Sequence, residues 1–334
     1  MIYIICQDFK STSGNHAGMR HLYQEIAKKK SDVKLYILNK KGIGIPHCNR
    51  IIAVLLLIKL IFLYRKGDKF LFTEALFKGS SHCEMIHALR LFHKKAPIYA
   101  MAHLTPSMIQ KSFTVEQIKN FAADVTETIT LGSSLTLFFK QMGITNVHTS
   151  FHYVDNNYYA AKTKEINKPI SVIVMGAMAR DFKMLAEIVK SVPQAHFNIC
   201  KGHKNIDKLF EGVNNVTLYS FMPENNLKEL MSKADISLNV MDDTIGSNVI
   251  CTSLAMGLAM ICSNVGSIHD YCDESNTIFC KSQQDFIAAI NWLVANPEVL
   301  RKMQKQAIQA SKRLSIDNYI SDIWTLLNRI NNKY

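Results

Sequence analysis

A chain of 334 residues with 48% hydrophobic and 20% charged residues has the composition of a folded globular protein, and seven prolines and fourteen glycines exclude a collagen-like or extensively disordered chain. The net charge is +12, and residues 1–150 carry +11 of it, with 20 Lys and Arg against 9 Asp and Glu. This excess indicates either a solvated basic surface or an anionic partner, such as a membrane surface, a lipid phosphate or a nucleic acid. We expect no nucleic acid, because no aromatic-interleaved basic stripe or known nucleic-acid module is present.

The cysteines and the N-terminus indicate a reducing compartment. The eight cysteines show no C-x-x-C spacing, and Cys6, Cys200 and Cys262 lie inside apolar runs, as buried free thiols do. The first residues, MIYIICQDFK, lack the basic n-region and cleavage site of a signal peptide and predict a β-strand. We therefore expect a cytoplasmic protein, located at the inner face of the cell membrane if its basic half binds lipid.

The first half of the chain predicts an α/β domain in which short apolar strands alternate with helices. Strands are expected at 2–6, 33–38, 69–73, 97–102, 127–131 and 147–151. Gly14 and Gly18 bracket the turn after the first strand, where α/β domains place ligands, but their spacing does not fit a dinucleotide fingerprint, so we expect no nicotinamide or flavin cofactor. His103 follows the strand at 97–102 on the same ligand-binding edge, and a purely structural histidine is the alternative.

Two helices of this half allow alternative interpretations. The helix expected over 49–66 contains IIAVLLLIKLIFLY, which is shorter than the roughly 20 apolar residues that a membrane span needs. Burial against the sheet is the expected outcome, and a position in a membrane interface, with basic flanks meeting lipid phosphates, is the alternative. The helix over 80–94 contains HCEMIH, in which Cys83 and His87 share one face; because no third ligand is in view, we expect no metal site.

The second half repeats the α/β pattern after a polar segment. Residues 152–169 lack apolar periodicity, which indicates a linker, and strand-like runs follow at SVIVMG, HFNICKG, NVTLYSF and ADISLNV, with a helix from about Ala179. Only helical patterns remain after Ser282. We therefore expect domains at 1–151 and 170–315, a linker at 152–169 and a last helix within 316–334.

The segment from Asp242 to Ser263 predicts a glycine turn, a helix and a strand in very little chain. Gly246 lets an anion approach the backbone at the helix start, where free N–H groups and the positive end of the helix dipole favour phosphate. Arg180, Lys183 and Lys201 follow other strands of the same domain. Because the carboxyl ends of parallel strands lie on one edge, these cations can converge on a crevice that suits a diphosphate.

With these features, the chain resembles the retaining GT-B glycosyltransferases of the large bacterial group that builds lipopolysaccharide, capsule and glycolipid. The resemblance covers nearly the whole chain, and the runs ITLGSS, ADISLNV, SLAMGLAMICS and VGSI fall in the family's order. It implies two Rossmann-like domains with parallel sheets facing across a cleft, with the nucleotide-sugar donor bound mainly by the C-terminal domain and a glycan or lipid-linked acceptor mainly by the N-terminal one. It also implies that the last helix crosses back to the first domain, and that no metal or further cofactor is required.

The resemblance assigns the site residues as well. His103 matches the family's active-site histidine near the transferred sugar, and Arg180 and Lys183, a few residues later than the usual spacing, would neutralise the donor diphosphate. The donor-binding positions are Gly14, Asn15, Gly18, Lys201, Asp243, Thr244, Gly246, Ser247, Asn248 and Thr252.

One motif departs from the family pattern. The two carboxylates of the family's E-x7-E motif fall on Thr244 and Thr252, and a hydroxyl makes only part of the contact that a carboxylate makes with the nucleotide ribose. Asp243, next to the first position, is the candidate substitute. The expected function is sugar transfer in bacterial surface polysaccharide synthesis. A degenerate GT-B protein that only binds a nucleotide or glycan, and a GT-B nucleotide-sugar epimerase, are the alternatives.

Overall fold

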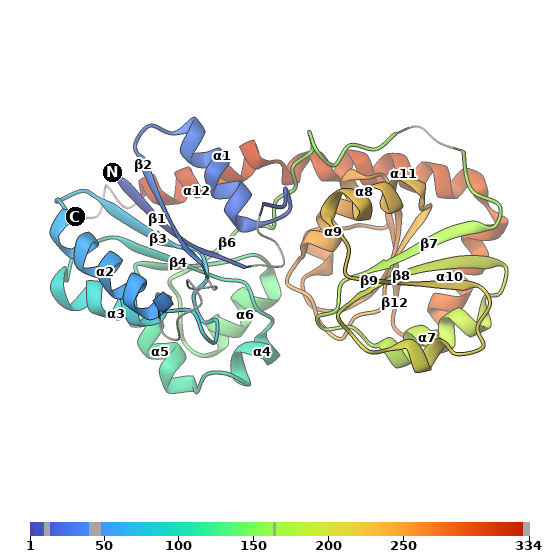
Figure 1. Ribbon diagram of the computed structural model, residues 1–334, viewed down its shortest axis with the longest axis horizontal. Coiled ribbons are helices and arrows are strands. Elements are labelled where there is room, and N and C mark those ends of the chain that lie inside the picture. The colour runs from blue at the N-terminus through green and yellow to red at the C-terminus, as the bar shows by residue number, and fades with distance from the viewer. Residues whose placement is uncertain (10–13, 40–47, 163–164, 330–334) are drawn as a thin grey trace. The chain divides into compact units, whose positions relative to one another are not determined.

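The computed structural model describes residues 1–9, 14–39, 48–162 and 165–329, which form two compact units (Figure 1). Unit 1 consists of Met1–Phe151 and Ile316–Tyr334, and unit 2 of His152–Ser315. Each unit contains one six-stranded sheet in which every strand pair is parallel. The predicted α/β class, with two Rossmann-like sheets in one chain, is confirmed.

Unit 1 has the strand order β2-β1-β3-β4-β5-β6. Its strands are β1 (Ile2–Asp8), β2 (Val33–Asn39), β3 (Lys69–Phe72), β4 (Ile98–Ala102), β5 (Glu127–Thr130) and β6 (Val147–Thr149). Its helices are α1 (Met19–Lys29), α2 (Cys48–Leu63), α3 (His82–Phe92), α4 (Pro106–Gln110), α5 (Val115–Asp124), α6 (Ser133–Gln141) and α12 (Ile316–Arg329). The order of the strands reverses at β1, which pairs with both β2 and β3. In doubly wound sheets, ligands bind outside the carboxyl ends of the strands at such a switch point.

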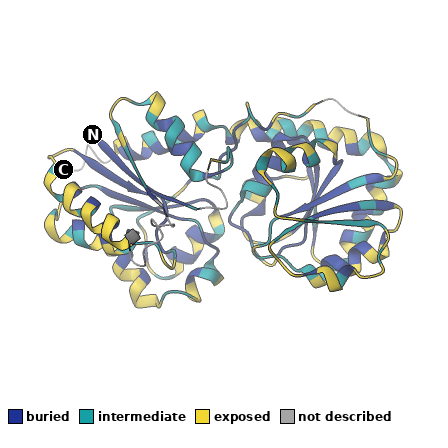
Figure 2. Cartoon of the chain, in the orientation of Figure 1, coloured by how far each residue is buried: buried dark blue, intermediate teal, exposed yellow. Residues whose placement is uncertain are grey.

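The central strands of unit 1 are apolar because both faces of the sheet are covered. All seven residues of β1 and all four of β3 are buried, and Figure 2 shows the strands as the buried layer between partly exposed helices. Strands that are buried on both faces are continuous apolar runs rather than alternating ones. These short runs are what located the strands in the sequence.

Helix α12 packs within unit 1, although it follows unit 2 in the chain. The hydroxyls of Tyr23 on α1 and Tyr319 on α12 are 3.0 Å apart, and the Lys69 ammonium donates to the Leu327 carbonyl at 2.7 Å. Asp322 pairs with His148 at the end of the sheet, with 3.0 Å between Oδ2 and Nε2. These buried polar contacts fix the rotation of an amphipathic helix whose apolar face covers the strands.

Helix α2 is only partly buried, contrary to the main expectation. Ala53, Leu56 and Leu60 lie against the unit, but the opposite face is also apolar and is exposed, with Phe62 84% exposed. Figure 2 shows this face along α2. One helix can bury only one stripe against a sheet, so a helix that is apolar around most of its circumference leaves its second face in solvent. Among the described residues, no helix is both long enough and apolar enough to span a membrane.

Unit 2 has the strand order β12-β11-β10-β7-β8-β9, the order of a dinucleotide-type doubly wound sheet. Its strands are β7 (Ile170–Met175), β8 (Ala195–Gly202), β9 (Val216–Ser220), β10 (Ile236–Asn239), β11 (Ala259–Ser263) and β12 (Thr277–Cys280). Its α-helices are α7 (Phe182–Ser191), α8 (Glu224–Lys233), α9 (Asn248–Ala255), α10 (Gln283–Ala295) and α11 (Pro297–Ser311). Short 3-10 helices occur at Asp207–Phe210, Ile268–Asp270 and Lys312–Leu314. The strand order reverses between β7 and β10, which places this unit's switch point there.

Two local features of unit 2 differ from the sequence expectation. The polar segment that begins at His152 contains the buried residues Tyr153, Val154 and Tyr159 and packs within unit 2, where Val154 forms a parallel bridge with Ser315. The helix expected from about Ala179 begins only at Phe182. Ala179 has a left-handed φ of 48°, which no helix accommodates, and the Asp181 side chain caps the helix instead.

The HCEMIH motif on α3 holds the loop after β3 in place. Nδ1 of the fully buried His82 accepts the Glu74 N–H at 3.2 Å, and Sγ of Cys83 accepts the Leu76 N–H at 3.4 Å. His87 points elsewhere and pairs with Asp124 at 2.7 Å. Cys83 and His87 therefore have separate partners. The residues of the motif hold the loop after β3 and pair with α5, which explains their presence on this helix.

The burial of His82 predicts a loss of stability in acid. Burial lowers the pKa of His82 to about 3, whereas an unfolded histidine titrates near 6.5. Its contribution to the free energy of unfolding is complete above pH 6.5 and is lost as the pH falls from 6.5 toward 3, by about 1.4 kcal/mol per unit. Between pH 6.5 and 4.5, wild type should lose about 2 kcal/mol more than His82→Gln in denaturant unfolding. His87→Gln, on an exposed part of the same helix, is the matched control and should behave as wild type.

Candidate functional site

The switch point of unit 2 brings together the segments that follow β7 and β10. The Asp242 N–H donates to the Ala179 carbonyl at 3.1 Å, the Asp181 N–H donates to the Val240 carbonyl at 3.3 Å, and Arg180 forms a bridge with Met241. The two segments are therefore tied backbone to backbone at the carboxyl edge of the sheet. This edge is where a doubly wound unit binds a ligand.

Arg180 lies in this junction, half-buried, and its guanidinium group has no carboxylate partner among the described residues. Its Nε and Nη1 are buried and have no hydrogen-bond partner among the described residues. A Cβ on Gly176 would come within 3.3 Å of Arg180 Nη2 and 3.2 Å of Val249 Cγ2, so the side chain passes close to the first turn of α9. Burial lowers the pKa of Arg180 from 12.5 to about 10, and the side chain stays charged at neutral pH. A buried cation without a counter-ion is suited to an anionic ligand.

The first turn of α9 lies beside Arg180 and is formed as the sequence predicts. Ser247 caps the helix, its Oγ accepting the Ile250 N–H at 3.4 Å, and the Asn248 side-chain oxygen is buried without a hydrogen-bond partner among the described residues. The helix start also carries free backbone N–H groups and the positive end of the helix dipole. An anion at this point would meet both these groups and the guanidinium.

Gly246 is required at the turn that leads into α9. Its φ is +91°, and a Cβ there would lie 2.2 Å from the ring of Tyr271. The Tyr271 hydroxyl accepts the His152 N–H at 2.7 Å, which ties this turn to the start of unit 2. Gly266 has a similar role, because a Cβ there would lie 2.1 Å from the Thr244 carbonyl. Gly266 lies in the run VGSI that carries the family resemblance, but its role at this turn was not identified from the sequence, and Tyr271 has no motif that marks it.

The two threonines in the positions of the missing carboxylates are engaged within the fold. Thr244 is 5% exposed and its Oγ1 accepts the Gly246 N–H at 3.2 Å. Thr252, also 5% exposed, donates from Oγ1 to the Asn248 carbonyl at 2.6 Å. Asp243 accepts the Thr244 N–H at 2.8 Å, and burial raises its pKa above the ordinary value. Both threonine side chains support the turn and the helix.

The two predicted lysines differ from Arg180 in their surroundings. Lys183 is exposed on α7, and Lys201, at the end of β8, is paired with Asp207, with 2.5 Å between Nζ and Oδ2. A paired lysine is already neutralised and attracts an added anion less strongly. Among the described residues, Arg180 is therefore the predicted cation whose Nε and Nη1 atoms are buried without a hydrogen-bond partner.

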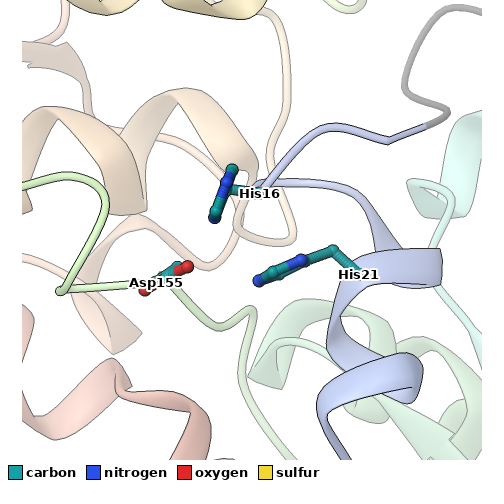
Figure 3. Close-up of side chains that lie close together, drawn as sticks. All are labelled: His16, His21 and Asp155. Atoms are coloured by element: carbon teal, nitrogen blue, oxygen red, sulfur yellow. The ribbon is translucent and has the colours of Figure 1, made fainter.

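In unit 1, the glycine loop follows β1 as predicted. Gly14 has a left-handed φ of 80°, and the Gly18 N–H donates to the Asn15 carbonyl at 2.9 Å just before α1 begins. The ring of His16 on this loop lies near the ring of His21 on α1, with 4.4 Å between the centroids (Figure 3). Asp155, also drawn in Figure 3, belongs to unit 2, where its Oδ1 accepts the Asn157 N–H at 3.0 Å.

His103 follows β4 at the carboxyl edge of unit 1, as predicted, and pairs with a buried carboxylate. Its Nε2 lies 3.0 Å from Oε2 of Glu74, which follows β3. Burial alone would lower the pKa of His103, but the charge and hydrogen bond of Glu74 outweigh it and raise the pKa above its ordinary value. Glu74 was not identified from the sequence, although its position directly after a strand marks it.

Comparison with known proteins supports the fold and the class. Residues 169–296 match the family described as "Glycosyl transferases group 1". No curated protein matches the chain significantly. Sucrose-phosphate synthase of Thermosynechococcus elongatus superimposes over 100% of both chains with a TM-score of 0.76 at 11% identity. HepE of Anabaena in complex with UDP gives a TM-score of 0.76 at 13% identity, over 98% of this chain and 100% of its own. The lipopolysaccharide outer core galactosyltransferase WaaB gives 0.67 at 12% identity, over 97% and 99%.

The fold shared with these structures is GT-B. The family match covers residues 169–296, which is most of unit 2, so this unit is similar in sequence to the group 1 glycosyltransferases.

The environment of Arg180 predicts that its removal stabilises the ligand-free protein. Arg180→Met should raise the free energy of unfolding by about 2 kcal/mol, because a buried charge without a partner is replaced by an apolar side chain of similar length. Denaturant unfolding measures the change, and Lys183→Met, at an exposed position, should leave stability within about 0.5 kcal/mol of wild type. A destabilised Arg180→Met protein would show that the guanidinium is compensated in solution.

Proposed function

We propose that the protein transfers a sugar from a nucleotide-diphosphate sugar to a glycan or lipid-linked acceptor, with retention of anomeric configuration, in the synthesis of a bacterial surface polysaccharide. The observation that carries the donor assignment is the uncompensated guanidinium of Arg180 beside the first turn of α9. Unit 2 would bind the donor and unit 1 the acceptor. His103 keeps its predicted role near the transferred sugar.

The proposed chemistry fits what unit 2 offers. Breaking the bond between the anomeric carbon and the diphosphate places negative charge on the departing phosphate. Groups that are fixed in advance and directed at this developing charge make the largest electrostatic contribution to such a reaction. Arg180 and the N–H groups of the α9 first turn are of this kind, with Lys183 and the Asn248 amide as further donors in reach of the same edge.

A uridine nucleotide is the first donor to test. Solved structures of HepE, similar in fold, are described in complex with UDP, with UDP and glucose, and with UDP-glucose. The threonines at positions 244 and 252 are held within the fold, so the ribose would be contacted by other groups. Asp243 is the nearest carboxylate to the first position and is half-buried at the same turn.

The donor assignment predicts both binding and turnover. Thermal unfolding with UDP, GDP, CDP and their glucose or mannose conjugates should show a rise in Tm for one nucleotide class, and a matching nucleotide sugar should release its diphosphate when acceptor is supplied. Arg180→Ala should weaken nucleotide binding at least tenfold and abolish transfer while the protein stays folded. The exposed Lys140→Ala in unit 1 is a charge-matched control and should bind as wild type.

The alternative functions give different results in the same assays. A protein that has lost turnover would bind one nucleotide and leave every nucleotide sugar intact. An epimerase would convert free nucleotide sugar without an acceptor. Wild-type transfer by Arg180→Ala would refute the assignment of Arg180.

We also propose that unit 1 contacts an anionic membrane surface through a patch on α2 and α3. The patch consists of exposed apolar side chains: Ile51, Val54, Leu55, Ile58, Phe62, Leu91 and Phe92. The carboxyl ends of the two helices lie together, since Nε2 of His93 is 2.9 Å from the Ile61 carbonyl. Exposed basic residues adjoin the patch at Arg50, Lys59, Arg65, Lys66, Lys94 and Lys95.

Charge complementarity favours lipid as the occupant of this patch. Helix α2 contains no acidic residue, and the first 150 residues carry +11 of the net charge. An apolar helix face bordered by lysine and arginine is typical of peptides that lie in the interface of an anionic bilayer. In that position the Phe62 ring would lie among the acyl chains, and the lysine ammonium groups would contact the lipid phosphates. A lipid-linked acceptor would be reached from this position.

The membrane assignment predicts binding to phosphatidylglycerol-containing vesicles. Phe62→Ser should reduce the partition coefficient in vesicle flotation about tenfold, because burying a phenylalanine ring contributes about 1.5–3 kcal/mol. Leu137→Ser is the matched control: Leu137 is 56% exposed on α6 of the same unit, outside the patch, and this variant should bind as wild type. Equal binding to purely zwitterionic vesicles would contradict the electrostatic part of the proposal.

A further inference from the structure

The ion pair of Glu74 and His103 lies close to the switch point of unit 1. Glu74 follows β3, the strand that pairs with β1 where the strand order reverses, and His103 follows the adjacent β4. Glu74 is 1% exposed, and its carboxylate has no hydrogen-bond partner beyond this ion pair among the described residues. The imidazole is 24% exposed. A buried carboxylate therefore supports an imidazole that reaches solvent at the ligand-binding edge.

The loop that carries Glu74 is held from several sides. The Glu74 N–H donates to His82 and the Leu76 N–H to Cys83, while the Ala75 N–H donates to a carbonyl of β4 at 2.8 Å. Leu76 has a left-handed φ of 52°, a conformation that costs a non-glycine residue about 1 kcal/mol or more and persists where the surroundings enforce it. The fold therefore fixes a carboxylate in a position where it has one charged partner.

Four described titratable groups near this pair carry no charge at neutral pH. Cys6 on β1, Tyr23 on α1 and Tyr319 on α12 lie near the Glu74 carboxylate. Burial is the main cause that raises the pKa of each of the three, that of Cys6 to about 12, and the Glu74 charge is a smaller one. His82 on α3 is neutral because burial lowers its pKa to about 3. The Thr73 backbone favours the charged imidazole as well.

We propose that Glu74 is a positioning residue for His103: it holds the imidazole in one orientation and in its cationic form, so that His103 presents a positive charge at the edge where the sugar would bind. The inference rests on the proposed function, which assigns His103 to the sugar. In this proposal, His82 and Cys83 of the HCEMIH motif hold the loop so that the Glu74 carboxylate is correctly placed.

The first test measures the charge of His103 without any turnover. Nitrogen-15 NMR of the histidine side chains, with the His103 signal assigned through His103→Gln, should give a titration midpoint above 6.5 in wild type. Glu74→Gln keeps the shape of the side chain and removes its charge, so burial, which lowers the pKa of His103, is then opposed only by the smaller effect of the Thr73 backbone. The midpoint should fall by at least one unit, a tenfold or greater loss of the charged form at pH 7.

The matched control removes another histidine partner of the same unit. Asp124→Asn takes away the carboxylate 2.7 Å from His87 and should leave the His103 midpoint unchanged. An unchanged midpoint in Glu74→Gln would overturn the proposal. If that variant does not fold, a wild-type midpoint at or below 6.5 overturns it alone, and Glu74→Asp, which keeps the charge on a shorter side chain, should hold the midpoint above 6.5.

The second test uses turnover with the donor identified by the binding assays. Glu74→Gln should lower kcat at least tenfold with little change in the donor KM. The decline of the rate at alkaline pH should move to lower pH, because the active imidazolium then deprotonates earlier. Glu74→Asp should restore part of the rate. If Glu74→Gln lowers the His103 midpoint but keeps the wild-type kcat, the functional role of the Glu74–His103 pair is refuted. If the wild-type protein shows no sugar transfer but the NMR midpoints shift as expected, only the proposed function is refuted.

Discussion

The carboxyl edge of a parallel sheet, at the point where its strand order reverses, is the constraint on which both units depend. Strands that meet there send their following helices to opposite faces, and the loops between them cannot be covered by either helix layer. Polar side chains on these loops are held by the sheet below and stay open to a ligand above. In unit 2 this position holds Arg180 next to α9, and in unit 1 it holds the segment that carries Glu74.

The two edges handle charge in opposite ways. The Nε and Nη1 atoms of Arg180 are buried and have no hydrogen-bond partner among the described residues, which costs stability in the absence of a ligand and strengthens the attraction for an anion in a site of low polarity. His103, in contrast, has its own carboxylate, so its charge is set by the protein and does not depend on the substrate. Among the described residues, the charge of Arg180 is therefore left for an anionic ligand to balance, whereas the charge of His103 is balanced within unit 1.

The exposed face of α2 shows how a surface can retain apolar residues. A helix on one face of a sheet needs only a narrow stripe for packing, and here Ala53, Leu56 and Leu60 supply it. The exposed isoleucines and Phe62 on the opposite face are not needed for packing against the sheet, because the stripe already supplies that packing. Exposed apolar side chains beside lysine and arginine match the polarity and charge of the bilayer interface to which we assign this face.

Sequence alone was sufficient for the α/β class, most strand positions, the helix start at Gly246 and the presence of cations at the carboxyl ends of strands. Buried parallel strands and glycine turns are local in origin: a run of apolar residues or a left-handed φ leaves its mark within a few positions. The tertiary structure decided which cation is uncompensated, because Lys201 pairs with Asp207 whereas Arg180 pairs with no carboxylate in the part of the chain that the structure describes. It also revealed Glu74 as the partner of His103. It also placed Thr252 inside the fold and left one face of α2 in solvent. Ion pairing and burial depend on residues that are distant in the chain and adjacent in space, and a single sequence carries no direct record of those distances.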